Sequence, residues 1–205
     1  WETGGVEDKY ARWNISLSGA AASDDYRNEL NTMGYIVEID PYDKTRVARK
    51  RTALGRFAHE SAAFGKPVVG QPLAVYMGDD SRGEYIYKFV STKTWAAADA
   101  NPADRITTGD TYLDAGKLYV AKFNSDGTGT WLELTHGVNG ITSASTVYPF
   151  ADAADVLINL RLAADVAGAT KMDRPEWGEV NPVNGDVYFT MTNNSVRGST
   201  TQPLD

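Results

Sequence analysis

Short apolar segments separated by turn residues make up most of the chain. Residues 85–90 alternate apolar or aromatic side chains with other residues, as a half-buried strand does. Residues 35–39 form a similar run that stops at an Asp-Pro pair, and residues 73–77 lead into a Gly-Asp-Asp turn. Residues 186–191 have the same character near the end of the chain. This pattern predicts a fold built mainly of short β-strands.

One pair of predicted strands is joined by a turn with a clear signature. Residues 118–123 and 130–134 are rich in apolar and aromatic side chains, and the segment between them contains Asp126 and Gly127. Asp-Gly is a common hairpin tip because glycine readily adopts the left-handed backbone conformation that tight turns need. The segment also resembles the opening of a calcium-binding loop, but it lacks the Glu at the twelfth position, so a hairpin is favoured.

A glycine precedes four of the predicted strands, each of which contains a tyrosine; these glycines are Gly34, Gly83, Gly116 and Gly185. Periodic glycine and aromatic positions are typical of β-propellers, whose blades repeat the same strands. Because glycine is common before strands in general, an ordinary meander or sandwich is an open alternative.

Residues 151–168 show a helical pattern, with apolar side chains repeating along one stripe. Asp152 stands near the start of this segment, where the helix dipole favours negative charge, and Gly168 can end it. We expect the helix to brace the following loop, which carries Arg174 and Glu176.

The remaining segments predict little regular structure. Residues 95–100 are rich in alanine and predict a single helical turn. Residues 1–12, 18–25 and 198–205 read as loops or frayed ends. The resulting expectation is an all-β chain in which residues 1–205 form one β-propeller portion, with an incomplete set of blades and one inserted α-helix.

Composition excludes several classes of function. A net charge of −7 over 205 residues disfavours nucleic acid as a partner, since binding it needs a basic surface. The chain has no cysteine, so it has no disulfide, zinc thiolate or thiol nucleophile. No apolar run approaches the roughly 18 residues that span a bilayer, so we expect a soluble chain without a membrane span.

Four acidic clusters lie next to predicted strands. A carboxylate fixed at the end of a strand is a good oxygen ligand for a hard cation, and an arginine beside it adds a fork of donors that suits phosphate. The pattern indicates a metal-dependent site for an anionic oxygen ester. The clusters are residues 55–60, 76–80, 82–85 and 173–177.

Each cluster also has a plain structural interpretation. Glu60 is typical of a solvated surface residue, and a Gly-Asp-Asp sequence such as 78–80 is most often a turn. Residues 174–176, Arg-Pro-Glu, suit a preorganised site but also a surface ion pair on a rigid turn. Because His59 and His136 are the only histidines, the ligands would have to be oxygen atoms, which favours calcium, magnesium, manganese or ferric iron.

The chain resembles the PhoX-type alkaline phosphatases from about residue 13 to residue 194. The resemblance is carried by ordered segments, of which the longest is Val-Tyr-Met-Gly-Asp-Asp-Ser-Arg-Gly-Glu-Tyr-Ile-Tyr-Lys-Phe-Val. These segments are residues 35–41, 50–60, 75–90, 116–123 and 174–177.

The resemblance implies a secreted, periplasmic or extracellular β-propeller that hydrolyses phosphate monoesters, and some diesters, at a centre of iron (Fe3+) and calcium (Ca2+) with a bridging oxo group. It implies metal ligands at Glu60, Asp79 and Glu176, with Asp80 as the alternative to Asp79. It also implies that Arg174 and Lys122 hold the phosphate.

Two features depart from the family pattern. The family's metal centre uses a cysteine, which this chain lacks. Blades of about 40 to 45 residues also allow at most four or five blades here. We therefore expect a portion of a larger polypeptide or a trimmed homologue, whose open edges the rest of the propeller, on another segment or chain, would cover. A non-catalytic secreted binding module is the alternative function, and a calcium-dependent propeller lactonase or phosphotriesterase is a third.

Overall fold

The computed structural model describes residue 13, residue 15 and residues 18–202. The chain divides into two compact units, residues 1–34 and 35–205. In the first unit the described residues include the short 3-10 helix η2 (Glu29–Thr32). The expected loop at residues 18–25 is confirmed, since it contains turns and bends but no helix or strand. The expected loop at residues 1–12 lies outside the described residues. None of the helices in the described part of the chain is long and apolar enough to cross a membrane.

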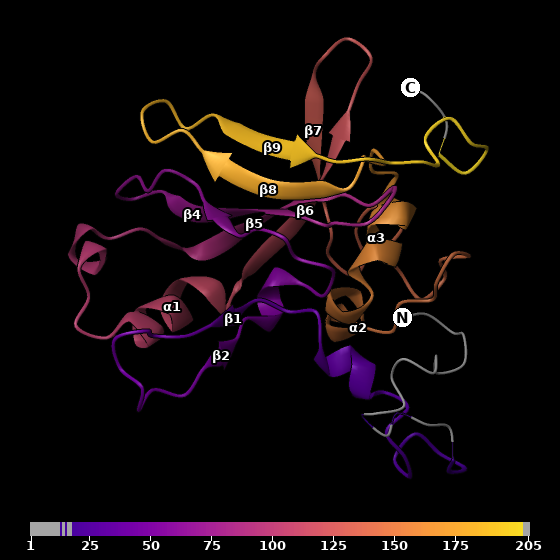
Figure 1. Ribbon diagram of the computed structural model, residues 1–205, viewed down its shortest axis with the longest axis horizontal. Helices are drawn as coiled ribbons and strands as arrows, with labels where there is room; N and C mark the ends of the chain where they lie inside the picture. Colours follow the sequence, from indigo (N-terminus) through magenta and orange to yellow (C-terminus); the bar gives the residue numbers. More distant parts are fainter. Residues whose placement is uncertain (1–12, 14, 16–17, 203–205) are drawn as a thin grey trace. The chain divides into compact units, whose positions relative to one another are not determined.

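The second unit is built around an antiparallel five-stranded sheet (Figure 1). Its strand order is β3 (Ala63–Phe64), β4 (Pro72–Gly78), β5 (Ile86–Thr94), β6 (Gly116–Phe123) and β7 (Gly129–Glu133). The predicted hairpin at residues 118–134 is confirmed as β6–β7, and Gly127 at its tip has a φ of 84°.

Two small antiparallel sheets complete the strands that the structure describes. The first pairs β1 (Val37–Glu38) with β2 (Arg49–Lys50), and the second pairs β8 (Pro175–Val180) with β9 (Val187–Met191). The prediction of a mostly β chain with few helices is confirmed. The three sheets of the described residues are open, and closure into a propeller stays a prediction.

Helices are few and short. They are the 3-10 helices η3 (Thr52–Leu54) and η4 (Ala97–Ala100) and the α-helices α1 (Arg105–Leu113), α2 (Ala153–Ile158) and α3 (Leu160–Ala167). η4 confirms the single helical turn expected at residues 95–100. Helix α1 was not predicted; it contains three threonines and a glycine, which are poor helix formers, and begins at the N-cap Asp104, whose side chain accepts from the Thr107 amide.

The single helix predicted at residues 151–168 is instead two helices that break at Asn159. Asn159 has φ −109° and ψ 44°, and it is the C-cap of α2. Its side-chain amide donates to Asp155 Oδ1 at 2.7 Å and to the Tyr148 hydroxyl at 3.2 Å. Asparagine bonds readily to nearby polar groups in non-helical conformations, and here those bonds stabilise the break.

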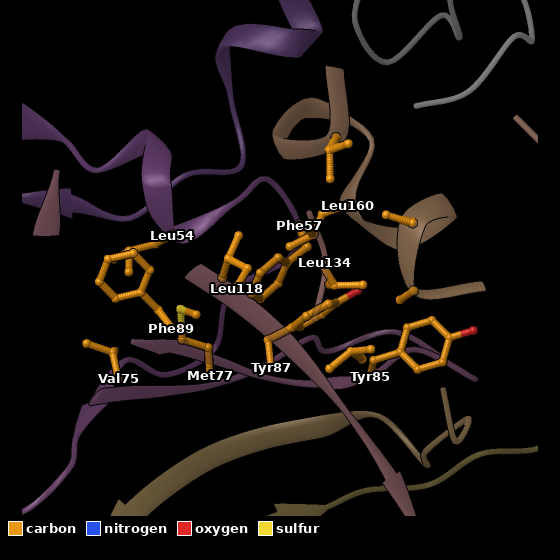
Figure 2. Close-up of a cluster of buried hydrophobic side chains, with 14 of the residues drawn as sticks. Leu54, Phe57, Val75, Met77, Tyr85, Tyr87, Phe89, Leu118, Leu134 and Leu160 are labelled. Carbon is orange, nitrogen blue, oxygen red and sulfur yellow. The ribbon is translucent and has the colours of Figure 1, made fainter. Parts of the chain in front are cut away.

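The core lies on one face of the five-stranded sheet. The antiparallel register aligns Met77 with Tyr87 and Tyr87 with Val120, so alternate residues of three neighbouring strands share this face. Figure 2 shows that Leu54 and Leu160 lie on the same side of the sheet as the Met77 and Tyr87 side chains, and all four belong to one core cluster. Each fully buried large apolar side chain contributes roughly 1.5–3 kcal/mol, so this layer holds the central strands rigidly.

The β8–β9 hairpin packs tightly against the end of β4 (Figure 1). A Cβ added at Gly78 would lie 2.5 Å from the Glu176 carbonyl oxygen and 2.8 Å from that of Pro175. The Ser61 hydroxyl donates to the Glu176 carbonyl at 3.1 Å and accepts from the Gly178 amide at 2.9 Å. Glu176 therefore lies on a strand held against β4, and the expectation that it belongs to a loop is wrong.

Candidate functional site

Three segments that are distant in sequence meet where β4 ends. His59 and Asp79 form an antiparallel bridge. The Glu60 amide donates to the Gly78 carbonyl at 3.2 Å, and the Asp80 amide donates to the Ala58 carbonyl at 3.0 Å. The close approach of β8 to Gly78 brings the third segment, residues 174–176, to the same place. The rigid strand end thus gathers three of the predicted acidic clusters.

Asp79 is fully buried, and its carboxylate is enclosed by protein donors. Arg161 of α3 donates Nε to Oδ2 at 2.8 Å and Nη2 to Oδ1 at 2.6 Å. The Ala58 amide also donates to Oδ1, at 3.3 Å. Burial raises the pKa of Asp79, and the Arg161 guanidinium opposes that rise. Both oxygens are therefore already engaged, and the carboxylate has no exposed face to offer a ligand.

Asp80 points to a different arginine and is partly exposed. Arg174 Nη2 donates to Asp80 Oδ2 at 2.9 Å, and its Nε lies 2.9 Å from Oδ1. The same guanidinium is 3.7 Å from Glu176 Oε1, which accepts from the Thr192 hydroxyl at 2.8 Å. We call Asp80, Arg174 and Glu176 the outer cluster. It holds one arginine between two carboxylates at a partly exposed position.

The backbone of Arg174 is strained. Its φ is 51°, a left-handed conformation that is uncommon for residues other than glycine. The following Pro175 is buried at the start of β8 and has a fixed φ of its own. A residue held in such a conformation by its surroundings is a recognised mark of functional sites.

Glu84 also lies in the turn that follows β4, which we call the corner, and its carboxyl is beside Arg161. Its Oε2 is 3.7 Å from Arg161 Nε and, among the described residues, has no hydrogen-bond partner. Burial raises the pKa of Glu84 to about 8, and Arg161 opposes this rise. The Glu84 carboxyl is therefore mostly protonated near neutral pH.

Neither histidine is aimed at the outer cluster by any contact of the described residues. The His59 ring stacks on Phe57 with 3.6 Å between centroids, and its Nε2 lies 3.0 Å from the Gly55 carbonyl. Burial lowers the pKa of His59 to about 4, so the ring is neutral near pH 7. His136 Nε2 lies 3.1 Å from the Phe150 carbonyl.

The residues predicted from the sequence separate into three groups. Asp79, Asp80, Arg174 and Glu176 lie together at the corner. Glu60 joins them through its backbone, while its side chain is exposed and makes no hydrogen bond or ion pair with the described residues. Lys122 is exposed on β6, opposite Thr130, and no contact among the described residues joins it to the outer cluster.

Arg161 is the residue of this corner that sequence reasoning missed. It is 82 residues from Asp79 in the chain, so no local motif connects them. The available signal was an arginine on the apolar segment 156–164, where a charged side chain needs a specific partner if it is to be buried.

The corner has oxygen donors suited to hard cations, but too few of them converge to hold one. Within the described residues, no group of three or more histidine, cysteine, aspartate or glutamate side chains is placed to bind a metal ion. Asp79 is enclosed by Arg161, and Asp80 and Glu176 both face Arg174. The described residues therefore do not form a complete metal site.

The fold and the corner together define a mostly β protein with a preorganised arginine–carboxylate cluster at the end of a strand. The family model described as alkaline phosphatase PhoX matches residues 2–204, and the chain belongs to this family. The chain is also similar to Pseudomonas fluorescens PhoX, solved in complex with vanadate, a transition state analogue. The two share 49% identity with a TM-score of 0.77.

That match covers 89% of this chain and 31% of the Pseudomonas fluorescens chain. The chain thus spans about a third of the length of the solved relative. No curated protein matches the chain.

Proposed function

We propose that this chain supplies part of the active site of a secreted phosphatase that hydrolyses phosphate monoesters, and some diesters. Three observations support the proposal: family membership, the similarity to a structure solved with a transition state analogue, and the outer cluster. The outer cluster carries it, because it places an arginine that can bind phosphate, held between two carboxylates, at a partly exposed position.

In this proposal Arg174 binds the phosphate. A guanidinium presents two parallel donors that match two phosphate oxygens, and it stabilises the charge that develops on them during transfer. Asp80 and Glu176 orient that guanidinium before the substrate arrives. Donors fixed in advance need no rearrangement during the reaction. Lys122, assigned to the phosphate by the resemblance, stays a prediction.

The metals of the proposal are calcium and ferric iron, as the resemblance implies. Carboxylate oxygens suit such hard cations. Glu60 and Glu176 are the proposed ligands from this chain. Of the two aspartates, Asp80 is the preferred third ligand, because Arg161 already binds both carboxylate oxygens of Asp79. Because no three such side chains converge in the described residues, other ligands would have to complete the site. The remainder of the propeller, on another segment or chain, is the proposed source and partner.

The competing function is a non-catalytic secreted module that binds or assembles with other proteins. The specific observation in its favour is the same incomplete ligand set among the described residues. The two proposals differ in whether the activity and the folding of the chain depend on bound metal.

The decisive experiment uses the purified 205-residue chain. Iron and calcium are measured per mole of protein, and hydrolysis of an aryl phosphate is followed with and without a chelator. Because other ligands would have to complete the site, we expect this chain alone to bind less than one equivalent of metal and to show weak, chelator-sensitive hydrolysis, both lost in Glu176→Ala. Glu179→Ala is the matched control, because Glu179 is exposed on the same strand and outside the cluster. A Glu176→Ala chain with unchanged metal content and activity would overturn the assigned site. Absence of metal and hydrolysis, with chelator-resistant folding, would favour the non-catalytic module.

A further inference from the structure

We infer that Arg161 is a positioning residue, which fixes the geometry of the outer cluster through Asp79 and the corner that follows β4. We call residues 78–85 the corner segment. The geometric part of this inference stands on the contacts below. Its consequence for phosphate binding rests on the proposed function.

A single guanidinium organises the corner segment. Arg161 engages both oxygens of Asp79, and its Nη2 also donates to Ser81 Oγ at 3.1 Å. Glu84 lies 3.7 Å from its Nε. Asp79 and Ser81 are thus both held by hydrogen bonds from one guanidinium, and the Glu84 carboxyl lies beside it. Only a planar group with several fixed donors can do this, and lysine offers a point charge instead.

The backbone of the corner segment closes around these contacts. The Asp79 amide donates to the Tyr85 carbonyl at 3.1 Å, and the Ser81 amide donates to the Asp79 carbonyl at 2.8 Å. Asp80 lies between the two residues that Arg161 holds, while its own side chain faces Arg174. Fixing Asp79 and Ser81 therefore fixes the direction in which Asp80 presents its carboxylate.

The same segment supports the backbone that leads to Arg174. The Met172 amide donates to the Glu84 carbonyl at 2.9 Å, and the Gly83 amide donates to the Met172 carbonyl at 3.0 Å. Arg82 and Asp173 form an antiparallel bridge. A shift of the corner would therefore move both partners of the Asp80–Arg174 pair.

Arg161 has a rigid base from which to act. Its neighbour Leu160 is fully buried in the core, as are Ala163 and Ala164 of the same helix. The break at Asn159 starts α3 as a separate helix. A side chain on such an element holds its partners closely, as the supporting shell of a functional site must.

The test must separate positioning from a merely structural ion pair. We would compare the 205-residue chain with Arg161→Lys, and use Arg82→Lys as the control, because Arg82 is an exposed arginine of the same corner. The first measurement is the NMR signal of the Arg174 Nε–H group, which reports the Asp80–Arg174 pair without any ligand. The second is the affinity for inorganic orthovanadate.

We expect Arg161→Lys to unfold cooperatively, with the Arg174 signal shifted and faster in exchange, and to bind orthovanadate about tenfold more weakly. Arg82→Lys should match the parent chain in both measurements. If Arg161→Lys does not fold, Asp79→Asn with Arg161→Gln replaces the buried ion pair by a neutral one, and the same two results are expected.

An unchanged Arg174 signal in a folded Arg161 variant would overturn the positioning role, whatever the affinity. Failure of the parent chain to bind orthovanadate would instead count against the proposed function, and the NMR comparison would still decide the role of Arg161. A weaker orthovanadate affinity with an unchanged Arg174 signal would also overturn the inference, because the loss would then not pass through the Asp80–Arg174 pair.

Discussion

Asp79 and Asp80 are adjacent in the chain but belong to different environments. Asp79 is fully buried and enclosed by Arg161 and a backbone amide. Asp80 is partly exposed, and its partner Arg174 is 34% exposed. The Asp79 carboxylate is sealed from solvent although the Arg161 side chain is 17% exposed, whereas both members of the outer pair are partly exposed, so a ligand can reach them.

The difference shows how two adjacent residues can have separate roles: Asp79 anchors the backbone of the site, and Asp80 faces the position where a ligand can bind. A buried ion pair adds little net stability over apolar residues, but it is costly to break, so it suits a fixed support. An exposed ion pair is worth little and can be replaced at low cost, so it suits a binding group. We therefore expect substitutions in the Asp79–Arg161 pair to change mainly the free energy of unfolding, and substitutions in the Asp80–Arg174 pair to change mainly phosphate binding.

The largest effect is expected from Arg161→Met, which leaves the Asp79 carboxylate buried without its partner. Breaking a buried pair in this way costs about 3–5 kcal/mol of the free energy of unfolding. Urea denaturation measures the loss. The double variant Asp79→Leu with Arg161→Met removes both charges and should recover most of it. A single-variant loss below about 1 kcal/mol, typical of exposed pairs, would contradict the distinction between inner and outer pairs.

The next effect is a pH dependence that comes from Glu84. Its pKa is raised from 4.5 to about 8 in the folded chain, so the folded state keeps a proton that the unfolded state has lost. Stability is therefore full below about pH 4.5 and falls as the pH rises through 8, by at most about 1.4 kcal/mol per pH unit. Glu84→Gln should remove this slope between about pH 5 and pH 8.

Urea denaturation at several pH values tests the role of Glu84, with Glu179→Gln as the control because Glu179 is exposed. The control should keep the slope of the parent chain. A Glu84→Gln chain with the same slope would mean that another group titrates in this range.

A smaller effect is expected at Gly78, where the end of β4 contacts the backbone of β8. Gly78→Ala places a Cβ 2.5 Å from the Glu176 carbonyl oxygen, and a backbone atom cannot move aside as a flexible side chain can. The β8–β9 hairpin must shift, at a cost of about 1–3 kcal/mol. Urea denaturation measures this cost. Gly65→Ala is the matched control, since its nearest contact would be at 3.4 Å, and it should cost much less. Equal losses in the two variants would contradict the tight packing at Gly78.

Much of this architecture could be predicted from the sequence, because the signals are local. An apolar run that leads into a Gly-Asp-Asp turn predicted β4, alternating side chains predicted β5, and Asp126-Gly127 predicted the β6–β7 hairpin. The Asp-Asp and Arg-Pro-Glu segments were also identified as site candidates, and the structure brings them together. The closure of the sheets into a propeller stays a prediction.

The features that were missed depend on tertiary contacts or on weak local propensity. The Asp79–Arg161 pair joins residues 82 positions apart, and no pattern within either segment indicates the other. The break at Asn159 depends on its bond to Tyr148, and Glu176 belongs to a strand because Ser61 and Gly78 hold β8 in place. Sequence alone also could not decide which aspartate of the pair faces inward, because a one-residue change of register reverses the answer.

The smallest effect is expected from Lys122→Ala, which tests whether the phosphate-binding site extends from the outer cluster to β6. Lys122 is exposed on β6, so its truncation should change the free energy of unfolding by less than about 0.5 kcal/mol. Because no contact among the described residues links it to the outer cluster, orthovanadate affinity should also stay within about twofold of the parent chain. Arg174→Ala, measured beside it, should weaken that affinity at least tenfold, because it removes a bidentate donor. A comparable loss in both variants would extend the phosphate site to β6, as the family resemblance implies, and the outer region would then include Lys122.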